Sequence, residues 1–331
     1  MLHILTESND PYFNMAQEEY VLTKLAEQDD CFLLWQNRPA IIVGRHQNAL
    51  EEINTAYVRE NGIAVVRRLT GGGAVYHDLG NLNFTYVVHD QGRGFDFQRF
   101  AQPVISALVS LGVKAEQSGR NDILIDGRKF SGNAEYRYRD RLLHHGTLMF
   151  DSDLAVVAAA LQVKPQKIAS KGVKSVRSRV TNIKEHLPPD VTFADFRQAL
   201  LTATVRQFGR DLQEYRLSEA DLAAIRQLQA EKYATWEWTY GQAPEFNLQR
   251  SRRYSFGEVD VRLNVREGII RNCKIFGDFF SHADMEQLAE RLVGRRYREE
   301  DLVAAIDNLD FAWFFPQLSR ETFVELLLGV E

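Results

Sequence analysis

The sequence predicts an α+β fold arranged in two domains, residues 1–245 and 246–331. Three observations support this class. Strand-like runs and amphipathic helical repeats both recur through the first 245 residues, and an alternating strand pattern followed by helices occupies the C-terminal part. The length of 331 residues also exceeds that of a typical single small domain. Hydrophobic residues make up 45% of the chain, which is ample for two cores.

In the first domain, short apolar runs bounded by turn residues predict strands, and apolar residues at helical spacing predict helices. A helix is expected from Asn14 to Leu25 after Pro11, and another from Phe97 to Leu108, ending near Gly112. A third opens at Thr192-x-x-Asp195, a capping box. The expected strands are Phe32–Trp35, Ala40–Val43, Ile63–Val66, Leu82–Val88 and Asp122–Asp126.

In the second domain, the segment Val259–Val265 alternates strictly between apolar and polar residues, as a half-buried strand does. The pair Glu267-Gly268 then turns the chain into a second strand, Ile269–Ile275. Helices are expected after Ser281-x-x-Asp284, through Leu302–Ile306, and from Phe323 to Leu328 before Gly329. About 80 residues with this pattern form a small α+β domain that can hold its own core.

Composition excludes several classes of partner. The net charge of −5 gives no basic field for a nucleic acid or a membrane surface. No stretch reaches the ~20 apolar residues of a membrane helix, so a soluble cytoplasmic protein is expected. Cys31 and Cys273 lie far apart and outside any C-x-x-C pattern, which disfavours both a disulfide framework and a cysteine zinc site.

A glycine-rich stretch, Arg67–Phe84, indicates an anion site. Gly71, Gly72 and Gly73 have no Cβ, so their backbone can approach a ligand closely and direct N–H groups at phosphate or carboxylate oxygens. Arg67 and Arg68 follow a strand and alternate between its faces, so one of them should reach the ligand. A flexible hairpin with solvated arginines is the plain alternative. The stretch is neither a Walker loop nor a G-x-G-x-x-G helix opening.

A second cluster surrounds a predicted hairpin. Asp122 and Lys129 fall on adjacent strands joined by the turn Asp126-Gly127, so their side chains can meet. An ordinary surface lysine would fit the same pattern. The neighbouring pair His144-His145 is interpreted as a hydrogen-bonding site, because two consecutive histidines on one strand cannot both ligate a metal on one face.

A third cluster, Lys164–Lys184, carries seven basic residues and no acidic residue. It fits a solvated basic face. It equally fits a mobile loop that closes over a polyphosphate or recognises an acidic protein.

Together, these clusters resemble the lipoate–protein ligases of the biotin/lipoate protein ligase superfamily. The resemblance rests on the motifs RRLTGGGAVYHDLGN, SGRND, RKFSGNA, HHGTL and KGVKSVRSRVTN, in this order. It extends from the N-terminal segment to Pro244, about three quarters of the chain, and the C-terminal part fits the family's small accessory domain. The order and spacing of the motifs are more specific than any one of them.

The resemblance implies a catalytic domain over residues 1–245, with mixed β-sheets flanked by helices, and an accessory domain over 246–331. It also implies a reaction in two steps. ATP and lipoate first form lipoyl-adenylate and pyrophosphate, and the lipoyl group then passes to a lysine of an acceptor. The implied acceptors are lipoyl domains of 2-oxoacid dehydrogenase complexes and the glycine-cleavage H protein. Mg²⁺ would accompany ATP without a dedicated protein cage, with Asp122 as the candidate ligand.

The resemblance also assigns site residues, carried over position by position. Lys129 would be the catalytic residue, contacting both the lipoate carboxylate and a nucleotide phosphate. The nucleotide and adenylate would further contact Arg68, Gly73, Ala74, Val75 and Tyr76. Five more residues occupy family motif positions, namely Asn81, Asn83, Asp122, His145 and Thr147.

Two alternatives remain beside the ligase hypothesis. A transferase could accept preformed lipoyl-adenylate or move lipoyl groups between proteins, and a non-catalytic module could bind anions or proteins. Related octanoyltransferases carry the acyl chain on a cysteine, but no cysteine lies between Cys31 and Cys273 and neither falls in a motif. The sequence therefore favours a mixed anhydride over a thioester.

Overall fold

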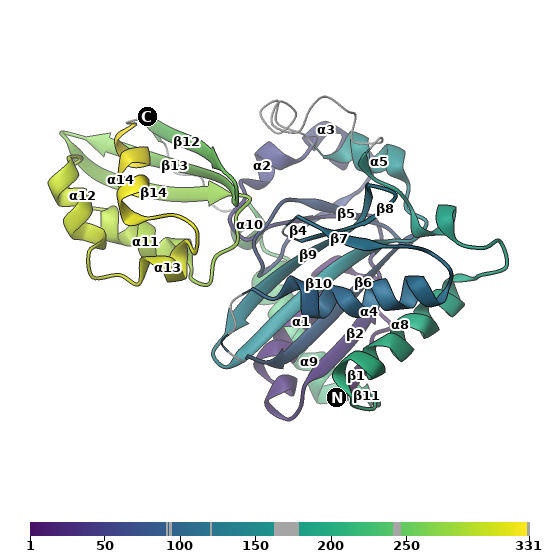
Figure 1. Ribbon diagram of the computed structural model, residues 1–331. Helices are drawn as coiled ribbons and strands as arrows, with labels where there is room; N and C mark the ends of the chain where they lie inside the picture. Colours follow the sequence, from purple (N-terminus) through teal and green to yellow (C-terminus); the bar gives the residue numbers. More distant parts are fainter. Residues whose placement is uncertain (91, 93–94, 120, 162–178, 241–245, 330–331) are drawn as a thin grey trace. The chain divides into compact units, whose positions relative to one another are not determined.

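The computed structural model describes residues 1–90, 92, 95–119, 121–161, 179–240 and 246–329 (Figure 1). The chain forms two compact units. The first unit consists of Met1–Val43, Leu50–Arg67 and Val75–Thr239, and the second of Gly44–Ala49, Arg68–Ala74 and Tyr240–Glu331. The glycine-rich loop therefore belongs to the same unit as the C-terminal part of the chain.

A mixed sheet, of eight strands within the described residues, forms the frame of the first unit, in the order β11-β1-β2-β6-β10-β9-β8-β7. β1 pairs in parallel with β2 and β11, and the remaining pairs are antiparallel. The strands are β1 (Leu2–Leu5), β2 (Cys31–Trp35), β6 (Asn81–His89), β7 (Glu116–Ser118), β8 (Asp122–Ile125), β9 (Arg128–Tyr138), β10 (Arg141–Met149) and β11 (Gln213–Arg216).

Helices α4 (Phe97–Ser110) and α8 (Phe193–Phe208) lie side by side along one face of this sheet (Figure 1). Their apolar stripes and the inward residues of β6 fill the main core. The capping box of α8 forms at Thr192 as predicted, and Gly209 ends the helix in the left-handed region at φ +63°. Helix α1 (Pro11–Thr23) contacts β6 and β10 and packs against α9 (Glu219–Leu228).

A smaller mixed sheet belongs to the same unit. Strand β3 (Ala40–Val43) pairs in parallel with β4 (Ala64–Arg67) and antiparallel with β5 (Val75–His77). The unit also contains α2 (Ala49–Glu52) from Leu50 onward, together with α3 (Thr55–Glu60), α5 (Leu154–Ala160) and α10 (Trp236–Thr239). It further contains 3₁₀ turns at Leu25–Glu27 and Ile183–His186 and a π-helical turn at Gln229–Tyr233.

The second unit contains an antiparallel sheet in the order β12-β13-β14, covered by helices that share its core. Glu267 and Gly268 join β13 to β14 with φ values of +54° and +70°, a turn that favours glycine at the second position. The elements are β12 (Leu248–Tyr254), β13 (Gly257–Arg266), β14 (Ile269–Gly277), α11 (Met285–Leu292), α12 (Glu299–Ile306), α13 (Phe311–Phe314) and α14 (Arg320–Leu328).

The predicted mixed sheets flanked by helices, with an α+β C-terminal part, are confirmed. The first helix begins at Pro11 rather than Asn14, because Asp10 caps it through the Tyr12 N–H, and Leu25 opens a 3₁₀ turn instead of ending the helix. Strands β1, β11 and β12 were not predicted, because they are short or rich in charge. The predicted domain boundary at 245/246 stays a prediction. No helix among the described residues is long and apolar enough to cross a membrane.

Candidate active site

Four of the predicted residues share one face of the large sheet. Asn81 and Asn83 alternate along β6 with apolar residues that enter the core. Strand pairing sets His145 of β10 opposite Thr85 and Thr147 opposite Asn83, and directly opposed residues point to the same face. This face is polar although it is largely buried. Buried polar side chains gathered on one face are typical of a ligand site.

Asn81 has unused hydrogen-bonding capacity inside this face. Its Nδ2 donates to Oδ1 of Asn83 at 2.9 Å, and Nδ2 of Asn83 donates to the Trp35 carbonyl at 3.4 Å. Oδ1 of Asn81 is buried and has no hydrogen-bond partner among the described residues. An unsatisfied buried acceptor costs about 1–3 kcal/mol, so a donor from a ligand or a water is expected there.

Glu18 of α1 joins this face and was not predicted from the sequence. Its buried carboxylate accepts from the Thr85 hydroxyl at 2.5 Å and lies 3.0 Å from Nδ1 of His145. Glu18 thereby orients the imidazole of His145. The sequence holds a weak signal for it, because Asn14 and Glu18 occur at i, i+4 on the same stripe as the buried Leu22.

Lys129 lies at the edge of the same face, where β8 meets β9. Its Nζ is 2.7 Å from Oδ1 of Asp122, which confirms the predicted meeting of these side chains. A register shift between Ile123 and Leu124 lets Lys129 share a face with Gly132, three residues further along. A Cβ on Gly132 would lie 3.0 Å from Nζ, and the Gly132 N–H donates to Oγ1 of Thr147 at 3.1 Å. Lys129, Asp122 and Thr147 therefore form one cluster.

The basic segment Lys164–Lys184 is described only from residue 179 onward, and the rest of the predicted loop lies outside the described residues. Its described end runs beside Lys129. Val180 forms a parallel bridge with Lys129, and the Thr181 N–H donates to the Lys129 carbonyl at 2.9 Å. The backbone of Lys129 is thus paired with β8 on one side and with Val180 and Thr181 on the other.

In the second unit, the glycine-rich loop is shaped by Arg68. This buried guanidinium donates to Oγ1 of Thr70 at 2.8 Å, to the Gly71 carbonyl at 2.6 Å and to the Gly73 carbonyl at 2.9 Å. Gly72 adopts φ +89°, which only glycine adopts without strain. Arg68 was predicted to contact the nucleotide, and in the structure these donors position the loop itself.

Two of the three glycines allow the loop to approach the C-terminal part of its own unit. The Gly72 N–H donates to the Phe279 carbonyl at 3.2 Å, and a Cβ on Gly71 would lie 2.3 Å from that oxygen. A Cβ on Gly73, in contrast, would meet nothing within 4 Å. Gly73 is therefore the glycine with open space beside it, and it is also the one selected from the sequence.

Arg67 and Arg68 have different hydrogen-bond partners. Arg67 donates to the carbonyls of Trp238 and Thr239 at 3.0 and 2.6 Å, and so anchors α10. Beyond the loop, Ala74 leads into β5, which carries Val75 and Tyr76. Burial raises the pKa of Tyr76 to about 12, with Asp78 adding to the effect, so the Tyr76 hydroxyl remains a hydrogen-bond donor at neutral pH.

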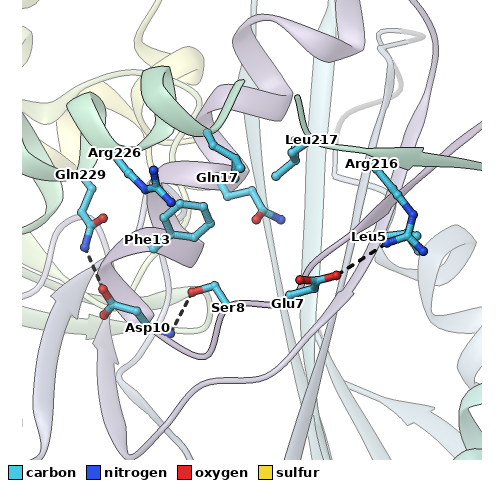
Figure 2. Close-up of a pocket in the computed structure, with 11 residues that line it drawn as sticks. Leu5, Glu7, Ser8, Asp10, Phe13, Gln17, Arg216, Leu217, Arg226 and Gln229 are labelled. Atoms are coloured by element: carbon cyan, nitrogen blue, oxygen red, sulfur yellow. Dashed lines mark hydrogen bonds and ion pairs between the residues drawn. The ribbon is translucent and has the colours of Figure 1, made fainter. Parts of the chain in front are cut away.

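A cavity of about 650 Å³ lies elsewhere in the first unit, between the start of α1 and helix α9 (Figure 2). Figure 2 shows Glu7 paired with Arg216, at 3.6 Å, and Asp10 bonded to Gln229, at 2.8 Å. None of the residues selected from the sequence lines it. Its lining contains no lysine, and its two carboxylates already have partners. This cavity therefore differs from the predicted site, which contains Lys129.

Two further features concern metal binding and the cysteine thiols. Within the part of the chain that the structure describes, no group of three His, Cys, Asp or Glu side chains could hold a metal ion. Cys31 and Cys273 are buried free thiols, and burial raises the pKa of each to about 12. Neither thiol is suited to act as a nucleophile at neutral pH.

Comparison with known proteins defines the class of this protein. Residues 10–205 match the family model of the lipoyl protein ligase A/B catalytic domain, and residues 243–327 match that of the bacterial lipoate protein ligase C-terminus. The chain is 48% identical to lipoate-protein ligase LplJ of Bacillus subtilis (strain 168), over 96% of this chain and 97% of that one. It is 44% identical to lipoate–protein ligase 1 of Staphylococcus aureus (strain Mu50), with the same coverage.

Solved structures of lipoate ligases are similar to this chain as well. LipL1 of P. falciparum, in complex with lipoate, superposes with a TM-score of 0.82 at 24% identity and covers 99% of both chains, which shows the fold. A bi-partite lipoate protein ligase of Thermoplasma acidophilum, described with its E2 lipoyl domain, gives 0.66 at 30% identity over 75% of this chain and 98% of that one. A lipoate-protein ligase A bound with ATP gives 0.65 at 28% identity over 73% and 99%. The chain belongs to the lipoate–protein ligase family and is an enzyme of the ligase class.

Proposed function

We propose that this enzyme activates lipoate with ATP and transfers the lipoyl group to lysine side chains of acceptor proteins. In the first step, a lipoate carboxylate oxygen attacks the α-phosphorus, the bond between the α- and β-phosphates breaks, and pyrophosphate leaves. In the second, the acceptor amine attacks the acyl carbon, an amide forms, and AMP leaves while the amine loses a proton. No protein nucleophile is needed, because the mixed anhydride is the activated species.

Lys129 is the proposed catalytic residue, and its surroundings carry this proposal. Adenylation brings a carboxylate against a triphosphate, so a cation between them lowers the repulsion. Lys129 lies at the edge of the polar face, and the ion pair with Asp122 holds its Nζ close to the backbone of Gly132, where an added Cβ would lie 3.0 Å from Nζ. In this account Nζ contacts the lipoate carboxylate and the α-phosphate together.

We assign the nucleotide to the glycine-rich stretch. Gly73 and Ala74 offer backbone to the phosphates, Arg68 sets the loop conformation and contributes positive charge, and Val75 and Tyr76 contact the adenylate. Two observations support this assignment: a Cβ on Gly73 would have open space around it, and the Gly73 carbonyl accepts a hydrogen bond from Arg68.

Lipoate is assigned to the polar face of the large sheet. Asn81, Asn83, His145 and Thr147 line it, and the unpaired Oδ1 of Asn81 supports the presence of a ligand or water there. Mg²⁺ would enter with ATP. Asp122, the ion-pair partner of Lys129, is the candidate protein ligand, and phosphate oxygens and water would supply the rest.

The proposed acceptors are lipoyl domains of 2-oxoacid dehydrogenase complexes and the glycine-cleavage H protein, in a cytoplasmic setting. We also infer that residues 1–245 form the catalytic domain and 246–331 an accessory domain. Support comes from the Thermoplasma relative described with its E2 lipoyl domain, and from the separate family models for the two parts.

One assay tests the proposal. Purified enzyme is incubated with lipoate, MgATP and an apo lipoyl domain, and the mass of the acceptor is measured. Addition of one lipoyl group is expected. Modification only when lipoyl-adenylate is supplied would replace the proposal with a transferase that does not activate free lipoate, and no modification in either case would refute both.

A further inference from the structure

Behind the polar face, on the core side of the same strands, lies a buried group of polar side chains formed by Glu135, His144 and Asn133. Glu135 and Asn133 occur at i, i+2 on β9, and strand pairing sets His144 of β10 directly opposite Glu135. Nδ1 of His144 is 2.9 Å from Oε1 of Glu135, and Nε2 is 3.2 Å from Oδ1 of Asn133. The side chains of Glu135 and His144 are fully buried.

Hydrogen-bond chemistry fixes the protons of this group. Nδ2 of Asn133 donates to the Asn121 carbonyl at 3.1 Å, so Oδ1 of Asn133 is the atom that faces His144 and must accept. Nε2 of His144 therefore carries a hydrogen. One further proton lies between Nδ1 and Oε1 of Glu135, and the pair has no net charge whichever atom holds it. A neutral pair is what burial among Phe84, Phe97 and Phe100 requires.

Asn133 connects this pair to the candidate active site. Its backbone N–H and its Nδ2 both donate to the Asn121 carbonyl, and Nδ2 of Asn121 donates back to the Asn133 carbonyl at 2.7 Å. Asn121 directly precedes Asp122, the partner of Lys129. A Cβ on Gly146 would lie 2.4 Å from Oδ1 of Asn133, so the carboxamide fills the space that this glycine leaves. These hydrogen bonds thus hold the corner formed by Asn121 and Asp122 in place from the core side of the sheet.

We propose that His144, held by Glu135, is a positioning residue for adenylation. It acts through Asn133 to fix the Asn121–Asp122 corner and hence the place of Nζ of Lys129. The inference rests on the proposed function and deepens it, because it assigns a role to the first histidine of the HHGTL motif, which touches no proposed ligand position. His145, the second histidine, points to the opposite face.

The structure offers matched variants. His144→Phe keeps the aromatic packing and removes the N–H that Asn133 accepts. Glu135→Gln can replace Glu135 atom for atom, since its Oε1 can accept from the Asp96 N–H, as Oε2 of Glu135 does at 3.1 Å, and its Nε2 can donate to Nδ1 of His144. Glu135→Leu can do neither. Asn133→Ala removes the group through which His144 is proposed to act.

ATP–pyrophosphate exchange with lipoate is measured per folded active site, with kcat and KM separated. His144→Phe, Glu135→Leu and Asn133→Ala are each expected to lower kcat about tenfold to a hundredfold, with KM for ATP and lipoate within about threefold of wild type. Glu135→Gln is expected to stay within about threefold of wild type. The double variant His144→Phe/Asn133→Ala should lose no more than Asn133→Ala alone, because the two residues act in series.

Three results would overturn the inference: a kcat of His144→Phe close to wild type, losses that multiply in the double variant, or a crystal structure of His144→Phe that keeps the Lys129–Asp122 ion pair in place. A purely structural role would lower the amount of folded enzyme but not kcat per active site. Failure of the wild type to exchange pyrophosphate would instead refute the proposed function, and the crystal structure would still test the positioning of Lys129.

Discussion

Replacing Lys129 with methionine is the sharpest perturbation that the structure suggests. Methionine keeps most of the side-chain volume and removes the charge. The Lys129 side chain is 36% exposed, so an effective dielectric of about 20 applies, and two charges at about 4 Å then interact with about 4 kcal/mol. Removing this interaction from the transition state corresponds to about a thousandfold in kcat/KM for adenylation. ATP–pyrophosphate exchange in the presence of lipoate measures this step.

The same substitution should hardly affect folding. The Lys129–Asp122 ion pair is partly exposed, and such pairs contribute about 0.2–1 kcal/mol to the free energy of unfolding. Lys274→Met is the matched control, because Lys274 is 33% exposed and pairs with Glu286 at 2.6 Å, far along the sequence from every proposed site residue. Exchange by Lys129→Met at a rate within about threefold of wild type would refute the reasoning.

Three further predictions concern other parts of the chain. Gly146→Ala should lower the free energy of unfolding by about 1–3 kcal/mol, measured by denaturant titration, because the new Cβ would lie 2.4 Å from Oδ1 of Asn133 and 2.5 Å from the Phe84 ring; unchanged stability would contradict this packing. Asp221→Asn should cost about 1–3 kcal/mol at pH 7, because Asp221 accepts from Tyr20, Tyr215 and Ser218. Burial alone would raise the pKa of Asp221, but these hydrogen bonds hold the pKa below its ordinary value, so the stabilisation is complete above about pH 4 and is lost as the pH falls through the folded pKa. The stability gap between the two proteins should therefore narrow in acid, and a gap independent of pH would argue against an ionised Asp221. Finally, because burial raises the pKa of Cys31 and Cys273 to about 12, iodoacetamide should modify the folded protein about a thousandfold more slowly at pH 8 than a free thiol, and Cys31→Ala should still lipoylate the acceptor; loss of acyl transfer with adenylate formation retained would point to a thioester route.

Local signals predicted the Lys129 hairpin well. The pair Asp126-Gly127 takes φ values of +50° and +72°, the turn that such a dipeptide favours, and it fixes Asp122 and Lys129 on adjacent strands. The register shift that turns Lys129 onto the face of Gly132 could not be predicted, because no residue type marks it. The sequence patterns therefore predicted that Asp122 and Lys129 lie on adjacent strands, but not that Lys129 points to the same face as Gly132.

Residues brought in from distant segments were harder to predict. Glu18 contacts His145 although the two residues are 127 positions apart in the sequence. A carboxylate in a helix normally lies on the solvent-exposed side, so the sequence did not place Glu18 on a buried polar face. The three glycines were interpreted as one anion loop, whereas Gly71 and Gly72 are also required for the close approach of Phe279. Such contacts depend on tertiary packing, for which the sequence carries at most a weak signal, such as the placing of Asn14 and Glu18 on the same helical stripe as Leu22.

The most direct test of the central claim is a crystal structure of the enzyme with a non-hydrolysable analogue of lipoyl-adenylate. The account predicts that Nζ of Lys129 lies about 3 Å from both the acyl carbonyl oxygen and a phosphate oxygen, with the Gly73 backbone against the nucleotide. An analogue bound away from Lys129, or one whose acyl and phosphate oxygens are contacted by other cations, would contradict it.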